Sequence, residues 1–124
     1  MMRSKYRNRK AEVDGITFDS RKEARFYLFL KDAERRGEIT GLRLQVPYEI
    51  IPAIHEEEVV HLKTKDKVVT RCVQKAVHYV ADFVYTEKAT GKEFVVDVKG
   101  VRTEGYKLKK KMMRAFNGIE ITEV

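Results

Sequence analysis

The sequence predicts an α/β fold in which two helices cover a mixed sheet, and three observations support this class. Residues 21–36 contain no glycine or proline and lie between a serine and a glycine, as a capped helix does. Residues 76–85 and 93–98 are almost continuously apolar, which is typical of strands covered on both faces. A second helical segment, residues 105–116, follows these strands, so helices alternate with strands along the chain.

The size of the chain limits its organisation. Its 124 residues, 43% of them apolar and 36% charged, suffice for one core and are too few for two full domains. We expect a basic N-terminal arm, residues 1–12, followed by a single domain over residues 13–124. No segment has the roughly 18 consecutive apolar residues of a membrane helix, and the N-terminus lacks a signal peptide's apolar core, so we expect a cytoplasmic protein with no membrane partner.

Cysteine and histidine usage excludes two kinds of stabilisation. Cys72 is the only cysteine, so no intrachain disulfide can form. One cysteine and three scattered histidines also do not make an ordinary structural zinc site. We therefore expect packing to stabilise the fold.

The N-terminal part of the predicted domain contains a hairpin and then a helix. Asp14 and Gly15 form a dipeptide favoured in type I′ turns, where both central residues need a positive φ, so we expect a hairpin over residues 12–18. Ser20 offers an N-cap to the helix that follows. Gly37 lies where a helix terminator belongs.

The first strand of the sheet is expected next. Residues 42–50 alternate between apolar and polar side chains, which is the period of a half-buried strand. Pro47 favours an edge strand or a bulge, and Pro52 ends the strand. Residues 57–75 carry β-branched side chains on both sides of a polar turn at residues 65–67, which indicates an inserted β-hairpin.

The remaining elements complete the sheet and supply the second helix. A turn at residues 90–92 joins the two apolar strands, and residues 105–116 form a basic amphipathic helix that ends at Gly118. The apolar positions of this helix are Leu108, Met112, Met113, Ala115 and Phe116. A short strand is expected within residues 119–124. The order is therefore helix, three strands, helix and strand, with one hairpin inserted after the first strand.

The charge distribution points to a polyanionic partner. Lys and Arg number 26 against 19 Asp and Glu, which gives a net charge of +7. The excess is concentrated in the N-terminal arm and in residues 99–114. The residues expected to contact nucleic acid are Arg3, Lys5, Arg7, Arg9, Lys10, Lys107, Lys110, Lys111 and Arg114. A solubilising surface and a solvated tail account for the same charges without a partner.

Two carboxylates interrupt the apolar strands, where an unpaired charge is costly. These residues are Asp82 and Asp97. Strand alternation places Asp97 and Lys99 on one face, and a hairpin between the two strands brings Asp82 to the same region if the register allows. A salt bridge at a strand end explains Asp97 and Lys99 equally well. Two neighbouring carboxylates repel each other unless they bind a cation.

A third carboxylate and an amide complete the candidate set. Glu23 shares a helical face with Phe26, Tyr27 and Leu30, so it is expected to point toward the sheet. The pattern from Ser20 to Glu23 also fits a capping box, and the two interpretations are compatible. Gln45 is a polar residue on a core strand that would hold a water or a phosphate, or else faces solvent.

Glu23 on a helix, then Asp82, then fourteen residues and Asp97-Val98-Lys99, resembles the PD-(D/E)XK nuclease superfamily, which includes restriction enzymes and four-way-junction resolvases. The resemblance covers residues 20–124 and implies a restriction-endonuclease-like αβββαβ core. It further implies that Asp82 and Asp97 bind Mg²⁺, or Mn²⁺ in its place, with help from Glu23 and the Val98 carbonyl. Lys99 would orient or deprotonate the attacking water. Ala81 departs from the superfamily's pattern, which has proline there.

The resemblance extends to small phage-encoded proteins of this superfamily. It implies a metal-dependent DNA endonuclease that hydrolyses phosphodiester bonds, acts on branched DNA such as Holliday junctions during recombination, and works in a phage-infected or lysogenic host. Symmetric cutting of two strands would favour a homodimer. The alternative is a non-catalytic nucleic-acid-binding module that uses the basic arm and the C-terminal basic helix.

Overall fold

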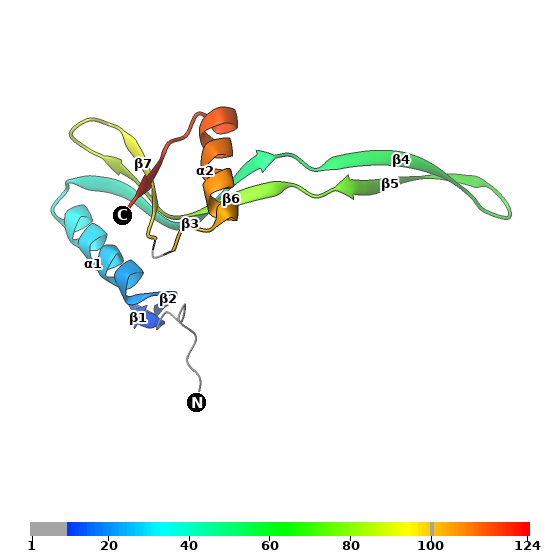
Figure 1. The fold of residues 1–124 in the computed structure, drawn as a ribbon. Coiled ribbons are helices and arrows are strands. Elements are labelled where there is room, and N and C mark those ends of the chain that lie inside the picture. Colours follow the sequence, from blue (N-terminus) through cyan, green and yellow to red (C-terminus); the bar gives the residue numbers. More distant parts are fainter. Residues whose placement is uncertain (1–9, 100) are drawn as a thin grey trace. The chain divides into compact units, whose positions relative to one another are not determined.

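The structure, a computed structural model, describes residues 10–99 and 101–124. Within these residues lie two helices and eight strands (Figure 1). In chain order they are β1 (Ala11–Val13), β2 (Ile16–Phe18), α1 (Arg21–Arg35), β3 (Ile39–Ile51), β4 (Ile54–His61), β5 (Asp66–Gln74), β6 (Val77–Glu87), β7 (Glu93–Asp97), α2 (Glu104–Asn117) and β8 (Ile121–Glu123). Across the described ranges, neither helix is long and apolar enough to cross a membrane.

A mixed four-stranded sheet confirms the predicted α/β class. Its strand order is β3-β6-β7-β8, and two further two-stranded sheets are formed by β1 with β2 and by β4 with β5. Strand β7 pairs antiparallel to β6 and parallel to β8. The element order, with a hairpin between the first two strands of the sheet, is the order expected from the sequence.

The chain divides into two compact units, each assembled from separate stretches of sequence. The first contains the described residues of Met1–Val46, Ala81–Arg102 and Ile121–Val124, and the second contains Pro47–Val80 and Thr103–Glu120. The predicted domain, residues 13–124, contributes to both units. Every candidate catalytic residue belongs to the first unit.

The first unit begins with the predicted hairpin. Val13 pairs with Ile16, and the two residues between them, Asp14 and Gly15, have φ values of 53° and 75°. Positive φ at both positions is what a type I′ turn requires. Strand β1 starts at Ala11, so residues 11 and 12 of the predicted arm belong to a hairpin, and residues 1–9 lie outside the described part of the chain.

Helix α1 starts and packs as its sequence indicates. The Ser20 hydroxyl accepts a hydrogen bond from the Glu23 backbone N–H at 3.1 Å, which caps the first turn. The buried face of the helix carries Ala24, Tyr27, Leu30 and Ala33. These side chains form one core cluster with Phe18, Ile39, Phe83 and Val96. The helix therefore covers the part of the sheet formed by β6 and β7.

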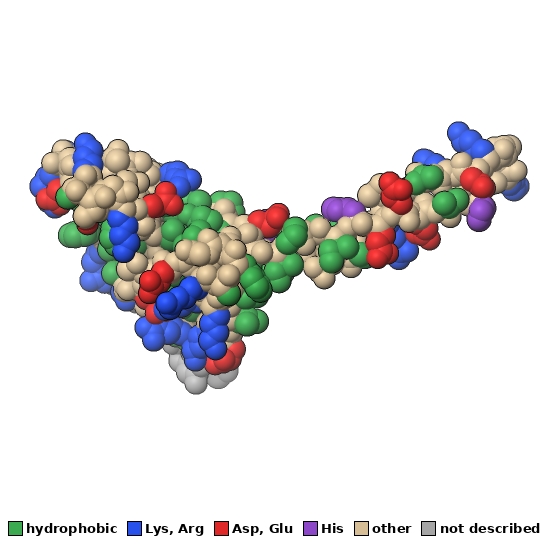
Figure 2. Space-filling model, turned by 90° about the horizontal axis from the view of Figure 1, so that it is seen from above, with side chains coloured by type: hydrophobic (Ala, Val, Ile, Leu, Met, Phe, Trp, Pro, Cys, Tyr) green, Lys and Arg blue, Asp and Glu red, His purple; other side chains and the backbone are tan. Residues whose placement is uncertain are grey.

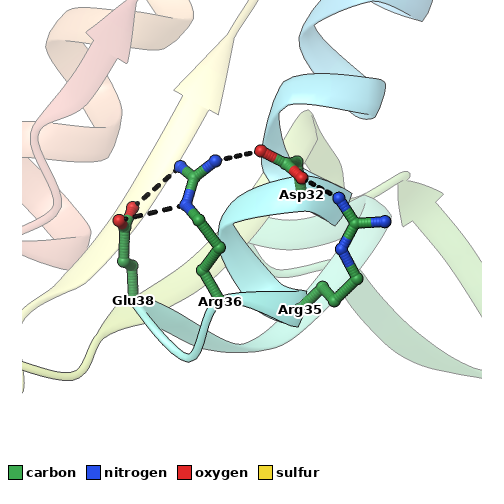
Figure 3. A network of polar contacts seen from close by, with 4 residues as sticks. All are labelled: Asp32, Arg35, Arg36 and Glu38. Atoms are coloured by element: carbon green, nitrogen blue, oxygen red, sulfur yellow. Dashed lines mark hydrogen bonds and ion pairs between the residues drawn. The ribbon is translucent and has the colours of Figure 1, made fainter.

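An ion-pair network closes the C-terminal end of α1 (Figure 3). Asp32 accepts hydrogen bonds from Arg35 and Arg36, and Arg36 also contacts both carboxylate oxygens of Glu38 at 3.1 Å. The hydrogen bond with Arg36 lowers the pKa of the Glu38 carboxyl. Exposed pairs of this kind add little stability, so we assign this network a local role in the turn that leads to β3.

The central strands are buried on both faces, as their apolar sequences predict. On β6, the neighbouring side chains of Phe83 and Val84 are 0% and 1% exposed. On β7, Val95 and Val96 are likewise buried. Since adjacent residues of a strand point to opposite faces, both sides of these strands are covered.

Strand β3 lies at the edge of the sheet, as Pro47 predicts. The even-numbered residues from Leu42 to Ile50 are buried or half-buried and the odd-numbered ones between them are exposed, which confirms the expected alternation. Gln45 interrupts the regular backbone with a φ of 50°. A non-glycine residue in the left-handed region is uncommon and often marks a functional site.

The second unit contains the inserted hairpin as a long two-stranded ribbon (Figure 1). It spans β4 and β5, so it begins three residues before the predicted start. The predicted turn at residues 65–67 is wrong, because Asp66 pairs with His61 and the turn is closed by the Leu62 N–H donating to the Lys65 carbonyl. Figure 2 shows hydrophobic, acidic, basic and histidine side chains interspersed along this ribbon.

Helix α2 ends at the predicted glycine, and its buried face agrees with the prediction only in part. Thr103 caps its N-terminus, and Gly118, with a φ of 66°, ends it in the left-handed conformation. The buried residues are Tyr106 and Met113, which lie two turns apart. Of the other apolar positions expected from the sequence, Met112 is half-buried, and Leu108, Ala115 and Phe116 are exposed. Tyr106 packs near Tyr79, with ring centroids 6.5 Å apart.

Candidate active site

Strands β6 and β7 place the two strand carboxylates side by side. Phe83 pairs with Val96, and continuing this antiparallel register by one residue places Asp82 opposite Asp97. One carboxylate oxygen of Asp82, Oδ2, accepts a hydrogen bond from the Val98 backbone N–H at 2.8 Å. The hairpin thus fixes Asp82 against the segment that carries Asp97 and Lys99.

Asp97 and Lys99 form an ion pair at the end of β7. Lys99 Nζ lies 3.0 Å from Asp97 Oδ1, and the two side chains are 27% and 3% exposed. Their separation of two residues places them on the same face of the strand, as expected. The salt bridge that the sequence left as an alternative is therefore present, in the same place as the candidate site.

Glu23 points from α1 toward these carboxylates and is itself only 6% exposed. Its pKa is raised to about 7, chiefly by burial and further by the negative charges of Asp82, Asp19 and Asp97. A hydrogen bond with the Asp19 backbone acts in the opposite direction. The Ser20 half of the predicted capping box is present together with the inward orientation, and the Glu23 carboxyl bonds to the backbone of Asp19. Asp19 had no motif to identify it in the sequence, and it adds to the negative charge around Glu23.

The pKa of Asp82 is also raised, to about 6. Burial is the largest cause, and the charge of Asp97 adds to it. The Val98 N–H, the Lys99 ammonium and the Gln45 amide each favour the ionised form. Two carboxyl groups that titrate near neutrality within one cluster are typical of functional sites, although structural networks produce such shifts as well.

Gln45 joins the carboxylates even though its backbone belongs to an exposed strand position. Its Nε2 donates to Glu23 Oε1 at 3.3 Å and to Asp82 Oδ1 at 3.4 Å. The backbone of Gln45 has a φ of 50°, in the left-handed region, where its side chain makes these two contacts. Gln45 is exposed, as the solvent-facing alternative expects, but its amide also contacts the carboxylates of Glu23 and Asp82.

We expect Gln45→Ala to be less stable than Gln45→Gly by about 1 kcal/mol. Both variants lose the amide, but alanine is strained at a positive φ and glycine is not. Urea denaturation of the two variants measures the difference. Equal stabilities would mean that the left-handed backbone at this position relaxes once the side chain is removed.

Sequence comparison places the chain in a family. A family model described as "Protein of unknown function (DUF1064)" matches residues 3–122. The chain belongs to the DUF1064 family. Comparison with curated proteins gives no match. Comparison with solved structures gives none either. The match spans all five candidate catalytic positions of this DUF1064 protein, and the family description assigns them no role.

The donor atoms of the site suit a hard divalent cation. The carboxylates of Glu23, Asp82 and Asp97 supply only oxygen, which Mg²⁺ and Mn²⁺ prefer. A cation would also offset the repulsion that raises the pKa values of Glu23 and Asp82. Over residues 10–99 and 101–124 the side chains as they stand form no group of three or more His, Cys, Asp or Glu that could hold a metal ion.

The structure places the remaining predicted ligand and contact residues as follows. Val98, predicted to offer its carbonyl, approaches Asp82 with its N–H. On α2, Lys107, Lys111 and Arg114 are exposed and Lys110 is half-buried. Lys107 pairs with Glu104 at 3.1 Å. Lys10 is exposed, whereas the predicted contacts Arg3, Lys5, Arg7 and Arg9 lie outside the described residues.

Proposed function

We propose that this DUF1064 protein is a metal-dependent endonuclease that hydrolyses phosphodiester bonds in DNA. The observation that carries the proposal is the convergence of three carboxylates, one lysine and one glutamine in one compact unit. These residues are Glu23, Gln45, Asp82, Asp97 and Lys99. Four of them come from α1 and three strands of one sheet, and Lys99 follows the end of β7 by two residues, so a rigid scaffold holds the cluster.

The element order supports the same assignment. Without β4 and β5, the elements from α1 onward run helix, three strands, helix, strand, and β8 pairs parallel to β7. This order suits the restriction-endonuclease-like αβββαβ core of the PD-(D/E)XK superfamily that the motif resembles. The Asp97-Val98-Lys99 segment begins at the last residue of β7, which is the third strand of this core.

In this proposal each side chain has a separate task. Asp82 and Asp97, helped by Glu23 and the Val98 carbonyl, would hold Mg²⁺ or Mn²⁺. When bound, the metal would stabilise the negative charge that develops on the phosphate and increase the acidity of bound water. Lys99 has a flexible ammonium with three donors and is positioned by Asp97, so it can orient the attacking water by hydrogen bonding. Gln45 holds Glu23 and Asp82 in place through its amide.

The proposed substrate is branched DNA, in keeping with the resemblance to four-way-junction resolvases. The net charge of +7 favours a polyanionic partner. A phage-infected or lysogenic host and a homodimer that cuts two strands belong to the same proposal.

A covalently closed plasmid tests the endonuclease activity, because it has no ends for an exonuclease. We expect nicked or linear DNA with Mg²⁺ and unchanged plasmid with chelator; unchanged plasmid with Mg²⁺ and with Mn²⁺ would contradict the proposal.

A non-catalytic nucleic-acid-binding module is the second candidate, and two contacts favour it. The Asp97–Lys99 ion pair gives both of these residues a structural role, and the Ser20 hydroxyl caps α1 by accepting from the Glu23 backbone N–H. Such a module would bind DNA without cutting it. Its affinity would also be the same with Mg²⁺ and with chelator once the ionic strength is matched, since no cation would be part of the site.

The basic residues of α2 give a prediction that both candidates share. The double variant Lys111→Ala/Arg114→Ala is expected to weaken DNA binding for all sequences and to reduce the slope of log K against log salt by about 2, because each phosphate contact releases counterions. Fluorescence anisotropy at several salt concentrations measures this slope. The control is Lys65→Ala/Lys67→Ala on the β4–β5 ribbon. Equal slopes in all three proteins would exclude α2 as the phosphate-contacting element.

A further inference from the structure

A basic pocket in the first unit lies directly beside the proposed catalytic residues. It has a volume of about 530 Å³ and is lined by Lys22, Lys99, Val101, Arg102, Glu123 and Val124. Three of these side chains are cationic and one is acidic. Lys99 is common to the pocket and to the carboxylate cluster, where it pairs with Asp97. A group bound in the pocket would therefore lie next to the reacting centre.

Lys22 is held at the pocket by the segment that follows β7. Its Nζ donates to the Lys99 backbone carbonyl at 3.0 Å. An ammonium has three donors, so this bond leaves capacity for an anionic ligand. Lys22 also precedes Glu23 in the first turn of α1, so its position is tied to the helix that carries a candidate catalytic carboxylate.

Arg102 is oriented by an acidic residue of β8. Its Nε lies 3.0 Å from Glu123 Oε2, and Glu123 is 16% exposed whereas Arg102 is 60% exposed. Glu123 is itself positioned by the parallel pairing of β8 with β7, where it lies opposite Asp97. This ion pair engages the Nε side of the guanidinium, and arginine has further donors in a planar fork that matches phosphate oxygens.

Two apolar side chains complete the pocket. Val101 and Val124 are 59% and 41% exposed. Exposed apolar side chains beside cationic groups suit a nucleotide, in which the C–H groups of the deoxyribose lie next to an anionic phosphate.

We propose that this pocket binds the phosphodiester group next to the one that is cut, on the same DNA strand. Lys22 and Arg102 would contact this group, and Glu123 would position Arg102. The inference rests on the proposed nuclease function and deepens it. A second phosphate contact beside the reacting centre holds the strand next to Lys99 in the bound substrate and in the transition state alike, so its loss is expected mainly in KM.

Two variants and one matched control test the pocket without depending on cleavage. With chelator present, ¹⁵N-labelled protein is titrated with a dinucleotide that has only an internal phosphodiester and with the same dinucleotide carrying a 5′-phosphate. We expect saturable shifts of the Lys99 and Arg102 amides in the wild type and in Lys31→Ala, a basic residue of α1 outside this pocket. Lys22→Ala and Arg102→Ala should bind about 10- to 100-fold more weakly.

Cleavage kinetics supply the second readout. The same two variants are expected to raise KM by about 10- to 100-fold with a smaller change in kcat, and Lys22→Arg should restore most of the loss. Glu123→Gln should show an intermediate rise in KM, because Arg102 remains but loses its orientation.

The outcomes separate this inference from the proposed function. Dinucleotide binding in the pocket without DNA cleavage would contradict the nuclease and leave the phosphate site in place. If the wild type cleaves DNA but Lys22→Ala and Arg102→Ala bind the dinucleotide and cleave DNA as well as Lys31→Ala does, the phosphate site is wrong and the nuclease proposal stands. Binding that requires the 5′-phosphate would also overturn the inference as stated, since it would show recognition of a strand end.

Discussion

Asp97→Asn is expected to lower the rate of Mg²⁺-dependent DNA cleavage by about 10³-fold, and Lys99→Ala by about 10²- to 10⁴-fold. Asp97 is nearly buried and would be a direct ligand of the metal, so an amide in its place removes a charge that nothing else at that position supplies. Lys99 would lose its hydrogen bond to the attacking water. Single-turnover rate constants measure both effects on the chemical step.

Matched controls come from the same strand hairpin. Glu93→Gln neutralises an exposed carboxylate of β7, and Lys92→Ala removes a lysine that lies over the Phe94 ring. Both are expected to cleave at rates close to the wild type. DNA binding should survive in all four variants. If Asp97→Asn and Lys99→Ala cleave as fast as these controls, the assigned site is wrong, whatever the activity of the protein.

Without divalent cations, the free energy of unfolding is expected to fall by about 1 to 3 kcal/mol as the pH rises from 5 to 8. The pKa of Glu23 is about 7 in the folded protein, against an ordinary value of 4.5. Below pH 4.5 this carboxyl is protonated in the folded and in the unfolded protein, and its contribution to stability is greatest there. At higher pH the unfolded chain releases the proton first, because its pKa is lower, and the folded state loses stability relative to it. That contribution is lost as the pH rises through about 7. Asp82, with a pKa of about 6, acts in the same direction.

Glu23→Gln isolates this effect. The variant should be more stable than the wild type at pH 8 and should show a smaller change between pH 5 and 8, because it carries no charge to repel Asp82 and Asp97. Urea denaturation in chelator at both pH values makes the comparison, with the exposed Glu12→Gln as control. Added Mg²⁺ should stabilise the wild type at pH 8 by mass action and stabilise Glu23→Gln less. A wild type whose stability changes between pH 5 and 8 by no more than that of Glu23→Gln would contradict the assigned repulsion.

Local patterns were sufficient for most of the fold. The Asp14-Gly15 turn and the Ser20 cap depend on neighbouring residues alone, so their sequences specify them. The apolar runs around Asp82 and Asp97 predicted buried strands, and the short turn between them predicted that these strands pair antiparallel, but it left their register open. The structure supplies that register, which places two carboxylates with fourteen residues between them side by side.

Features that depend on distant residues were harder to predict. Gln45 contacts Glu23 and Asp82 through a left-handed backbone, and no propensity of glutamine indicates that conformation. The buried face of α2 depends on Tyr106, which packs near Tyr79, so periodicity within the helix did not identify it. The basic pocket has the same origin, because Lys22 and Arg102 are eighty positions apart and meet through tertiary structure.

Cleavage of end-labelled duplex, single-stranded and four-way-junction DNA, with Mg²⁺, with Mn²⁺ and with chelator, tests the central claim most directly. We expect cutting by the wild type that requires a divalent cation, is fastest on the junction, and falls to background in Asp97→Asn. DNA that is bound by the wild type but remains intact with both metals would contradict a nuclease and favour the non-catalytic binding module.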